Sequence, residues 1–379
     1  MISDSVLTLA VDRGLLTAAQ ADGLKALAAE NTPPALPEEQ PPPLPPSLRY
    51  DAVDPDDEGL RFVTGFADIF VTLGLALFFG AAAYLISFYV IGATLWAIIA
   101  VLAWILAEFF TRRRRMALPS IVLLALFTTA IFACVFHIVA SPQQGSYAAW
   151  WLPSWGTRLW FAENASNILP AALITVAFVG LHYWRFRVPI TIAAGAAALT
   201  AAVIAGLDWA RPDTSWTIHN GVLLFCGLCV FALAMRFDMS DPQRQTRRTD
   251  VAFWLHLLAA PLIVHPLITA LLEGYALDAL LTTRTALIIL GIFLGFGVVS
   301  LIIDRRALLV SGLIYAGFAF GTLISQTALA DKTIPATVLA LGIFILLLSA
   351  GWRPLRGLIL RLLPGPLARR LPHPLSVQS

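Results

Sequence analysis

The sequence predicts an all-α, polytopic membrane protein with about ten transmembrane helices and a small cytoplasmic N-terminal helical hairpin. Three observations support this prediction. The 379 residues are 59% hydrophobic and only 13% charged, whereas soluble domains are about 25% charged. Apolar runs recur from residue 66 to residue 351, and the connections between them alternate between many and few basic residues. An ordinary soluble protein and a wholly disordered chain are therefore excluded.

Residues 1–30 are predicted to form the cytoplasmic hairpin. The first helix ends at Gly14, and Thr17 followed by Gln20 has the spacing of a capping box at the start of the second helix. Four leucines are expected to pack the two helices together: Leu15, Leu16, Leu24 and Leu27. A unit this small lacks a full core, so we expect it to bind a protein partner, a second copy of the chain or the membrane domain.

Residues 31–61 are predicted to form a proline-rich, acidic linker. Eight prolines lie between residues 33 and 46, which excludes a helix interior and favours an extended spacer. Residues 42–46 also fit the PxxP pattern, so a docking motif is the alternative. Residues 1–61 carry four basic and eleven acidic residues, a net of −7, and residues 62–379 carry 21 basic and twelve acidic residues, a net of +9. The total of +2 therefore conceals a boundary between two kinds of segment.

Residues 62–352 are predicted to form the transmembrane domain. A spanning helix needs about 20 apolar residues, and helices are expected because a bilayer offers no partner to an unpaired backbone group. Ten runs fit: 66–89, 91–110, 117–140, 167–184, 188–207, 218–235, 251–272, 285–303, 307–328 and 333–351.

The distribution of basic residues predicts on which side of the membrane each connection lies. Seventeen arginines fall in one set of connections, including the C-terminal tail, and four basic residues fall in the opposite set. By the positive-inside rule both termini are cytoplasmic, and we expect a multi-pass protein of the bacterial inner (cytoplasmic) membrane. Seven arginines are also candidate contacts for lipid headgroups: Arg112, Arg113, Arg114, Arg115, Arg244, Arg247 and Arg248.

Two segments are expected to lie on the membrane surface. Within the outer connection 141–166, residues 146–161 are expected to lie on the outer surface, with a substrate-gating lid as the alternative. This segment carries four tryptophans, which favour the headgroup region: Trp150, Trp151, Trp155 and Trp160. The tail 353–379 mixes arginine with leucine, which predicts a basic amphipathic cytoplasmic helix on anionic lipid, with a floppy basic tail as the alternative. The lipid bilayer is thus the first predicted partner.

The seventh apolar run carries the candidate intramembrane polar site. It contains His256, Pro261, His265, Pro266 and the terminal Glu273. Each proline frees a backbone carbonyl one turn earlier, and a kinked or broken helix with free carbonyls can bind an ion or a solute. The histidines are nine residues apart, about 180° around a helix, so they are not a metal-binding pair on one face. The alternative is that each histidine bonds to a neighbouring helix and packs there.

Other candidates each carry two interpretations. Glu108, near the end of the second run, either pairs with the arginines that follow or serves as a proton-relay carboxylate. Cys226 and Cys229 form a CxxC inside an apolar run, where two small buried residues at a helix contact are favoured over a redox or metal site. His182 is expected at the membrane interface, and Asp208 is expected to cap the outer end of the fifth helix. Two glycine pairs predict close helix packing: Gly291 with Gly295, and Gly317 with Gly321.

Residues 12–21, Asp-Arg-Gly-Leu-Leu-Thr-Ala-Ala-Gln-Ala, carry a Gly-hydrophobic-Ser/Thr-x-x-Gln/Glu pattern. With residues 247–257, they resemble bacterial, mainly proteobacterial, multi-pass membrane-protein families of unknown function that place such a hairpin before a many-helix domain. The resemblance implies this layout, and it implies no activity and no functional residue.

Three functional classes follow from these patterns. The first is a transporter or permease whose seventh helix lines a polar site for a small molecule or ion. The second is a membrane scaffold or sensor whose hairpin binds a partner or self-associates. The third is an intramembrane enzyme acting on a lipid, which would need polar residues clustered at one depth. The sequence predicts no catalytic residue, metal or cofactor and no nucleic-acid partner, because phosphate-loop, zinc-peptidase and nucleophile-elbow motifs do not occur.

Overall fold

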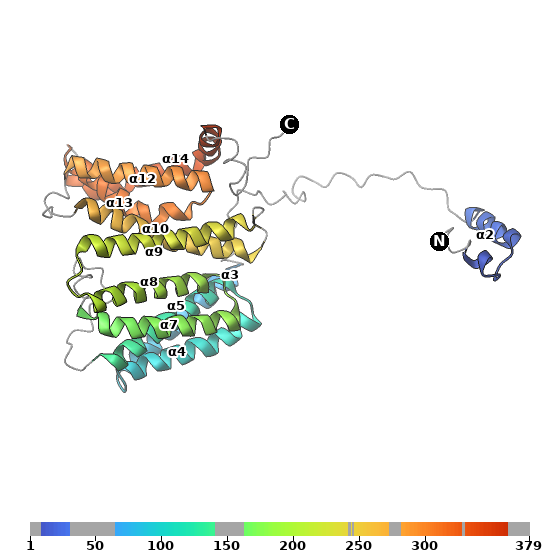
Figure 1. The fold of residues 1–379 in the computed structure, drawn as a ribbon, viewed down its shortest axis with the longest axis horizontal. Helices are drawn as coiled ribbons and strands as arrows, with labels where there is room; N and C mark the ends of the chain where they lie inside the picture. Colours follow the sequence, from blue (N-terminus) through green and yellow to red (C-terminus); the bar gives the residue numbers. More distant parts are fainter. Residues whose placement is uncertain are drawn as a thin grey trace. The chain divides into compact units, whose positions relative to one another are not determined.

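A computed structural model describes residues 9–30, 65–140, 163–241, 244, 246–272, 282–327 and 330–362 (Figure 1). The chain folds as two compact units, Met1–Asp57 and Glu58–Ser379.

The first unit contains α2, Ala18–Glu30, preceded by a helical turn. That turn ends at Gly14, which has a φ of 68° and thus a backbone conformation that favours glycine. The predicted capping box is confirmed, because the Gln20 backbone N donates to Thr17 Oγ1 (3.4 Å) and the Thr17 N donates to Gln20 Oε1 (2.9 Å).

The predicted leucine packing within this unit is wrong for three of the four leucines. Leu15 is 74% exposed, and Leu24 and Leu27 are also exposed. Ala21 is the buried apolar residue instead. Leu15, Leu24 and Leu27 therefore form an exposed apolar surface.

The second unit is helical throughout the part that the structure describes. Its helices are α3 Phe66–Ser87, α4 Ala93–Ala107, the π-helix η1 Glu108–Arg113, α5 Ala117–Val139, α7 Ala165–Phe186, α8 Ile190–Ala210, α9 Trp216–Met239, α10 Arg247–Leu272, α12 Thr283–Ile303, α13 Ala307–Ser325, the 3₁₀ turn η2 Ala330–Lys332 and α14 Thr333–Leu362. Among the described residues nine helices are long and apolar enough to cross a membrane. In α13 the qualifying apolar stretch, Gly312–Ser325, is shorter. This is the architecture of a polytopic membrane protein, while the count of ten crossings and the sides of the termini stay predictions.

Helices that follow one another in the chain pack as pairs: α4 with α5, α7 with α8, α9 with α10, and α12 with α13. Figure 1 shows α7, α8, α9 and α10 running side by side. Within its most apolar stretch α10 is 56% buried, more than any other spanning helix, because α8, α9 and α13 all contact it. The second half of the domain is therefore built around α10.

Small residues set the closest approach of α10 to its neighbour α9. A Cβ at Gly227 would lie 2.9 Å from the carbonyl carbon and oxygen of Leu262, so only glycine fits at this contact. Gly317 and Gly321 lie against Leu341 and Thr337 of α14, which confirms the predicted close packing of that pair.

The prediction is wrong for the other glycine pair. Gly291 and Gly295 have no atom within 4 Å of the position a Cβ would take. Helix α12 packs on α13 through a different face, where the Phe293 ring fills the space over Gly312. The glycine spacing alone could not identify which side of α12 meets another helix.

Candidate functional site

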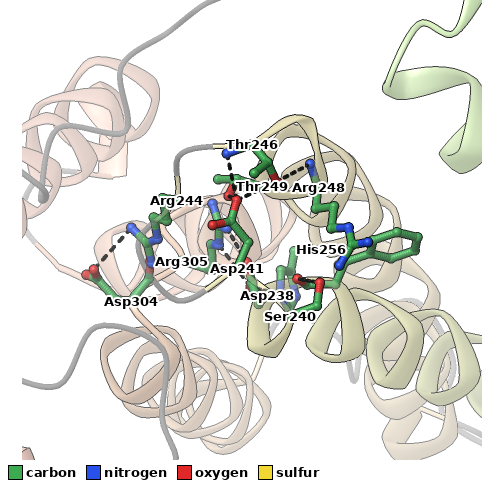
Figure 2. A network of polar contacts seen from close by, with 11 residues as sticks. Asp238, Ser240, Asp241, Arg244, Thr246, Arg248, Thr249, His256, Asp304 and Arg305 are labelled. Atoms are coloured by element: carbon green, nitrogen blue, oxygen red, sulfur yellow. Dashed lines mark hydrogen bonds and ion pairs between the residues drawn. The ribbon is translucent and has the colours of Figure 1, made fainter. Parts of the chain in front are cut away.

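A buried charge network joins α9, α10, α14 and the turn between α12 and α13. Figure 2 shows the part of it around Asp238 and Asp304. We use this name for seven residues: Asp238, Arg244, His256, Asp304, Arg305, Trp352 and Arg356. Asp238 lies in the last turn of α9, and His256 lies in α10. Asp304 and Arg305 form the turn between α12 and α13. The network therefore connects segments that are far apart in the chain.

Asp238 accepts from two partners at once. His256 Nε2 lies 2.8 Å from Asp238 Oδ2, and Arg305 Nε donates to the same oxygen at 3.0 Å. Arg305 Nη2 contacts the other oxygen, Oδ1, so the guanidinium grips the carboxylate with two groups. All three side chains are 2% exposed or less. Charged groups with so little exposure are rare and must compensate one another, as Asp238 and Arg305 do here.

The turn before α13 holds Arg305 in place. Its backbone N donates to the Ser300 carbonyl (2.9 Å), and its own carbonyl accepts from Ser300 Oγ (2.5 Å). Asp304 takes a left-handed conformation, with a φ of 56°, at the end of α12. Both features turn the chain sharply, so the two consecutive side chains reach different partners.

Asp304 forms the second centre of the network. Its Oδ1 accepts from Trp352 Nε1 at 2.8 Å and lies 3.7 Å from Arg356 Nε. Its Oδ2 lies 3.2 Å from Arg244 Nη1, and its backbone carbonyl accepts from Arg244 Nη2 at 2.7 Å. The Arg306 guanidinium lies 5.0 Å from the centre of the Trp352 ring. Asp304 thus attaches α14 and the segment between α9 and α10 to the α12–α13 turn.

A cap at the start of α10 positions the segment that carries Arg244. Asp241 Oδ2 accepts from the Thr246 backbone N (2.7 Å), Thr246 Oγ1 (2.6 Å) and Thr249 Oγ1 (3.1 Å). A carboxylate at this place satisfies free donors at the helix start and suits the positive end of the helix dipole. Figure 2 shows Asp241, Thr246 and Thr249 together at this end of the network.

The two predicted histidines lie on different sides of α10, as their spacing indicates. His256 is fully buried against α9, whereas His265 is exposed and its Nδ1 lies 2.7 Å from the Tyr315 hydroxyl of α13. Each histidine therefore bonds to a neighbouring helix, as the packing alternative expects. Glu273, the third ionisable group predicted here, lies outside the described residues.

The expectation of a broken seventh helix is wrong. Helix α10 runs without interruption from Arg247 to Leu272, with Pro261 and Pro266 inside it. The carbonyl of Leu262, which Pro266 deprives of its usual donor, lies against Gly227 of α9. This carbonyl therefore lies at the α9–α10 contact.

Glu108 has the predicted arginine pair and a second partner that sequence reasoning missed. Its Oε2 lies 3.4 Å from Arg112 Nη1 and 2.8 Å from Arg185 Nη2 of α7. Arg114 lies over the Phe109 ring, 5.6 Å from its centre. Arg247 and Arg248 are exposed at the start of α10, and the four tryptophans of the outer connection lie outside the described residues.

Three further positions differ from expectation. His182, expected at the membrane interface, is buried among aromatic rings near the end of α7, 4.5 Å from Phe186 and 5.5 Å from Phe127 between ring centres; its depth in a membrane stays a prediction. Of the CxxC pair, Cys226 is half-buried and Cys229 is exposed, and Gly227 between them makes the helix contact. Asp208 is buried, and its Oδ1 lies 3.3 Å from His219 Nδ1 at the start of α9.

The network consists mainly of residues that the sequence did not identify as a site. His256 stood out because an ionisable residue inside an apolar run is unusual. Asp238, Asp304 and Arg305 lie at the ends of runs, where acids and arginines ordinarily belong to connections. Within the part of the chain that the structure describes, no group of three His, Cys, Asp or Glu residues could hold a metal ion. Comparison with protein-family models, with curated proteins and with solved structures finds no match.

Proposed function

We propose that this chain is a proton-coupled transporter of small solutes in the bacterial inner membrane, with His256 as the group that binds the proton. The observation that carries the proposal is the Asp238–His256–Arg305 contact, which is buried where α9, α10 and the α12–α13 turn meet, at the ends of helices long and apolar enough to span a membrane. Ionisable residues at such places are costly, and they are typical of proton relays and substrate pathways.

The geometry orients His256 for proton binding. Nε2 faces the Asp238 carboxylate, and Nδ1 is buried with no hydrogen-bond partner in the described part of the chain. A proton taken up on Nδ1 leaves an Nε2–H that donates to Asp238. The carboxylate then stabilises the imidazolium, as an acid beside a histidine does in many proton-transfer sites.

Proton uptake changes the charge balance of the three groups. With a neutral histidine, Asp238 and Arg305 cancel, and with a protonated histidine the set carries one positive charge. Two cations then share one carboxylate, which weakens the hold of Asp238 on Arg305. Because Arg305 lies in the α12–α13 turn and Asp304 beside it holds Trp352, this change acts on α12, α13 and α14. The network is therefore suited to couple a proton to movement between α9–α10 and α12–α14.

The described conformation is closed at the middle of this region. Gly227 of α9 lies directly against the backbone of α10 at Leu262, and α10 is surrounded by neighbours. We infer that solute passage requires α9–α10 and α12–α14 to move apart, as in the alternating access of known transporter folds.

The test is electrical measurement on the purified full-length protein in liposomes adsorbed to a solid-supported membrane. Panels of amino acids, sugars, nucleosides, organic acids and inorganic ions are applied under an inward proton gradient. We expect a sustained, gradient-dependent current with at least one solute class. His256→Gln should remove that current, and Cys229→Ser, a change at an exposed position on α9, should retain it. No current from any class, or a full current in His256→Gln, would refute the proposal.

A second candidate function, a scaffold or sensor, is supported by the apolar surface of the first unit. Leu9, Leu15, Leu24 and Leu27 are exposed on a small helical unit that buries only Ala21 among its described apolar residues. Exposed apolar patches on small domains favour association with a partner. The test compares deletion of residues 1–48 with Leu24→Asp/Leu27→Asp in a strain lacking the protein. Full complementation by both, with the membrane domain still folded, excludes this role.

A further inference from the structure

A pocket lies at the end of α4, far along the chain from the buried charge network. Five residues line it: Ile105, Glu108, Phe109, Arg112 and Arg113. Its volume is about 440 Å³ and it is open on one side, enough for a phosphate-bearing headgroup by the size of ordinary ligand sites, about 300–1,000 Å³.

The π-helical turn η1, Glu108–Arg113, brings two arginines to the same pocket. In an α-helix, at about 100° per residue, positions five apart point about 140° away from each other. A π-helix instead bonds positions five apart, which returns Arg113 to the side of Glu108. Arg112, four residues after Glu108, already lies on that side, and both arginines line the pocket. π-Helical turns of this kind occur often at functional sites.

The charges around the pocket do not balance. Glu108 is the only acid in the lining, and Arg112 and Arg185 both contact its carboxylate. Arg113 makes no hydrogen bond or ion pair with any residue that the structure describes. Three guanidinium groups thus face one carboxylate, which leaves an excess of two positive charges at an accessible surface.

The other wall of the pocket is apolar and exposed. Ile105 lies one turn before Glu108 on α4, and Phe109 follows Glu108; both are largely exposed side chains. In a membrane, the exposed apolar residues of α4 contact acyl chains. A phosphate group beside the arginines and a hydrocarbon chain along Ile105 and Phe109 would therefore belong to the same molecule.

We propose that this pocket binds an anionic glycerophospholipid, with Arg112 and Arg113 contacting the headgroup phosphate and Ile105 and Phe109 contacting an acyl chain. Clusters of basic residues next to a membrane helix attract anionic headgroups. Arginine suits this role because its planar guanidinium can donate two parallel hydrogen bonds to a phosphate. The site is independent of solute transport and stands whether or not the chain moves a solute.

Native mass spectrometry of the detergent-purified full-length protein tests the proposal. The protein is titrated with phosphatidylglycerol and, separately, with phosphatidylcholine, and the dissociation constant of each is measured. Wild type should bind phosphatidylglycerol more tightly. Arg112→Gln/Arg113→Gln should weaken phosphatidylglycerol binding about thirtyfold, from two arginine contributions, and should weaken phosphatidylcholine binding less, because the choline group offsets the phosphate charge. Arg112→Lys/Arg113→Lys should lose less affinity for phosphatidylglycerol than the double glutamine variant, because the positive charges remain.

Matched controls distinguish a specific lipid-binding site from nonspecific electrostatic attraction of anionic lipids to the protein. Arg236→Gln removes an exposed arginine near the end of α9 and should leave phosphatidylglycerol binding unchanged. An equal loss in Arg236→Gln and in the double glutamine variant would overturn the proposal. Arg113→Gln alone, at an exposed position, should keep the wild-type melting temperature and still weaken binding. Displacement of phosphatidylglycerol by an equal concentration of inorganic phosphate would assign the pocket to free phosphate instead, and would also overturn the lipid proposal.

Discussion

Glu108 and Asp238 are both carboxylates paired with arginines, but their surroundings differ. The Glu108 and Arg185 side chains are 33% and 27% exposed, whereas Asp238 and Arg305 are 1% and 2% exposed. Solvent screens the first pair, so the pair contributes little to folding and its arginines stay available to a ligand. The second pair is dry, so each charge depends on the other. The same residue types thus form an open ligand site in one place and a closed network in the other.

The largest expected effect comes from breaking the buried pair. Asp238→Asn leaves Arg305 buried without its carboxylate, and the unfolding free energy should fall by about 3–5 kcal/mol. Thermal unfolding in detergent micelles measures this loss. Asp331→Asn, a neutralised acid at an exposed position, should leave stability unchanged. The double variant Asp238→Asn/Arg305→Met should recover most of the loss, and simple additivity of the two single changes would contradict the pairing.

The next effect concerns the attachment of α14. Trp352→Phe keeps the ring but removes the Nε1 donor that bonds to Asp304 at 2.8 Å. A hydrogen bond to a charged group contributes about 1.5–3 kcal/mol, and the melting temperature should fall accordingly. Trp209→Phe, at an exposed position on α8, is the matched control. Equal melting temperatures for the two variants would show that the bond to Asp304 does not hold α14.

The α14 contacts also show where sequence reasoning stops. Apolar runs predict the spanning helices well, because a bilayer demands about 20 apolar residues whatever their neighbours are. The same criterion ends the last run at residue 351, yet α14 continues through Pro354 to Leu362. Trp352 and Arg356 are buried at Asp304, and this tertiary contact cannot be seen in a hydropathy pattern.

The candidate site, too, could be predicted from the sequence only in part. His256 could be identified from the sequence, because a histidine inside an apolar run is exceptional. Its partners could not, because Asp238 and Arg305 are 67 positions apart and each lies where a connection begins. Arg305 served as a signal of membrane orientation, although its side chain is buried. Charge patterns locate the ends of helices, while the pairing between those ends depends on the fold.

A smaller effect on stability is expected from a substitution at the α9–α10 contact, compared with the same substitution on α7. Gly227→Ala places a Cβ against the Leu262 backbone, which should cost about 1–3 kcal/mol through overpacking. Gly180→Ala on α7 meets no atom within 4 Å and should instead stabilise the helix by up to about 1 kcal/mol. The difference between the two melting temperatures is the measurement. Destabilisation of similar size at both positions would mean that α9 and α10 are not in close contact there.

The smallest effect on stability should come from the half-exposed pair of Glu108 and Arg185. This is where the exposed pair and the buried Asp238–Arg305 pair should differ most clearly. Glu108→Gln removes two half-exposed ion pairs, so the unfolding free energy should change by less than about 1 kcal/mol. The same change frees Arg112 and Arg185 from their shared carboxylate and raises the positive excess at the pocket. Phosphatidylglycerol binding, measured by native mass spectrometry, should therefore tighten severalfold, by about 1 kcal/mol. A large loss of stability would place Glu108 with Asp238 among the structural charges, and weaker lipid binding would mean that Glu108 orients the arginines and does not merely compete with the phosphate.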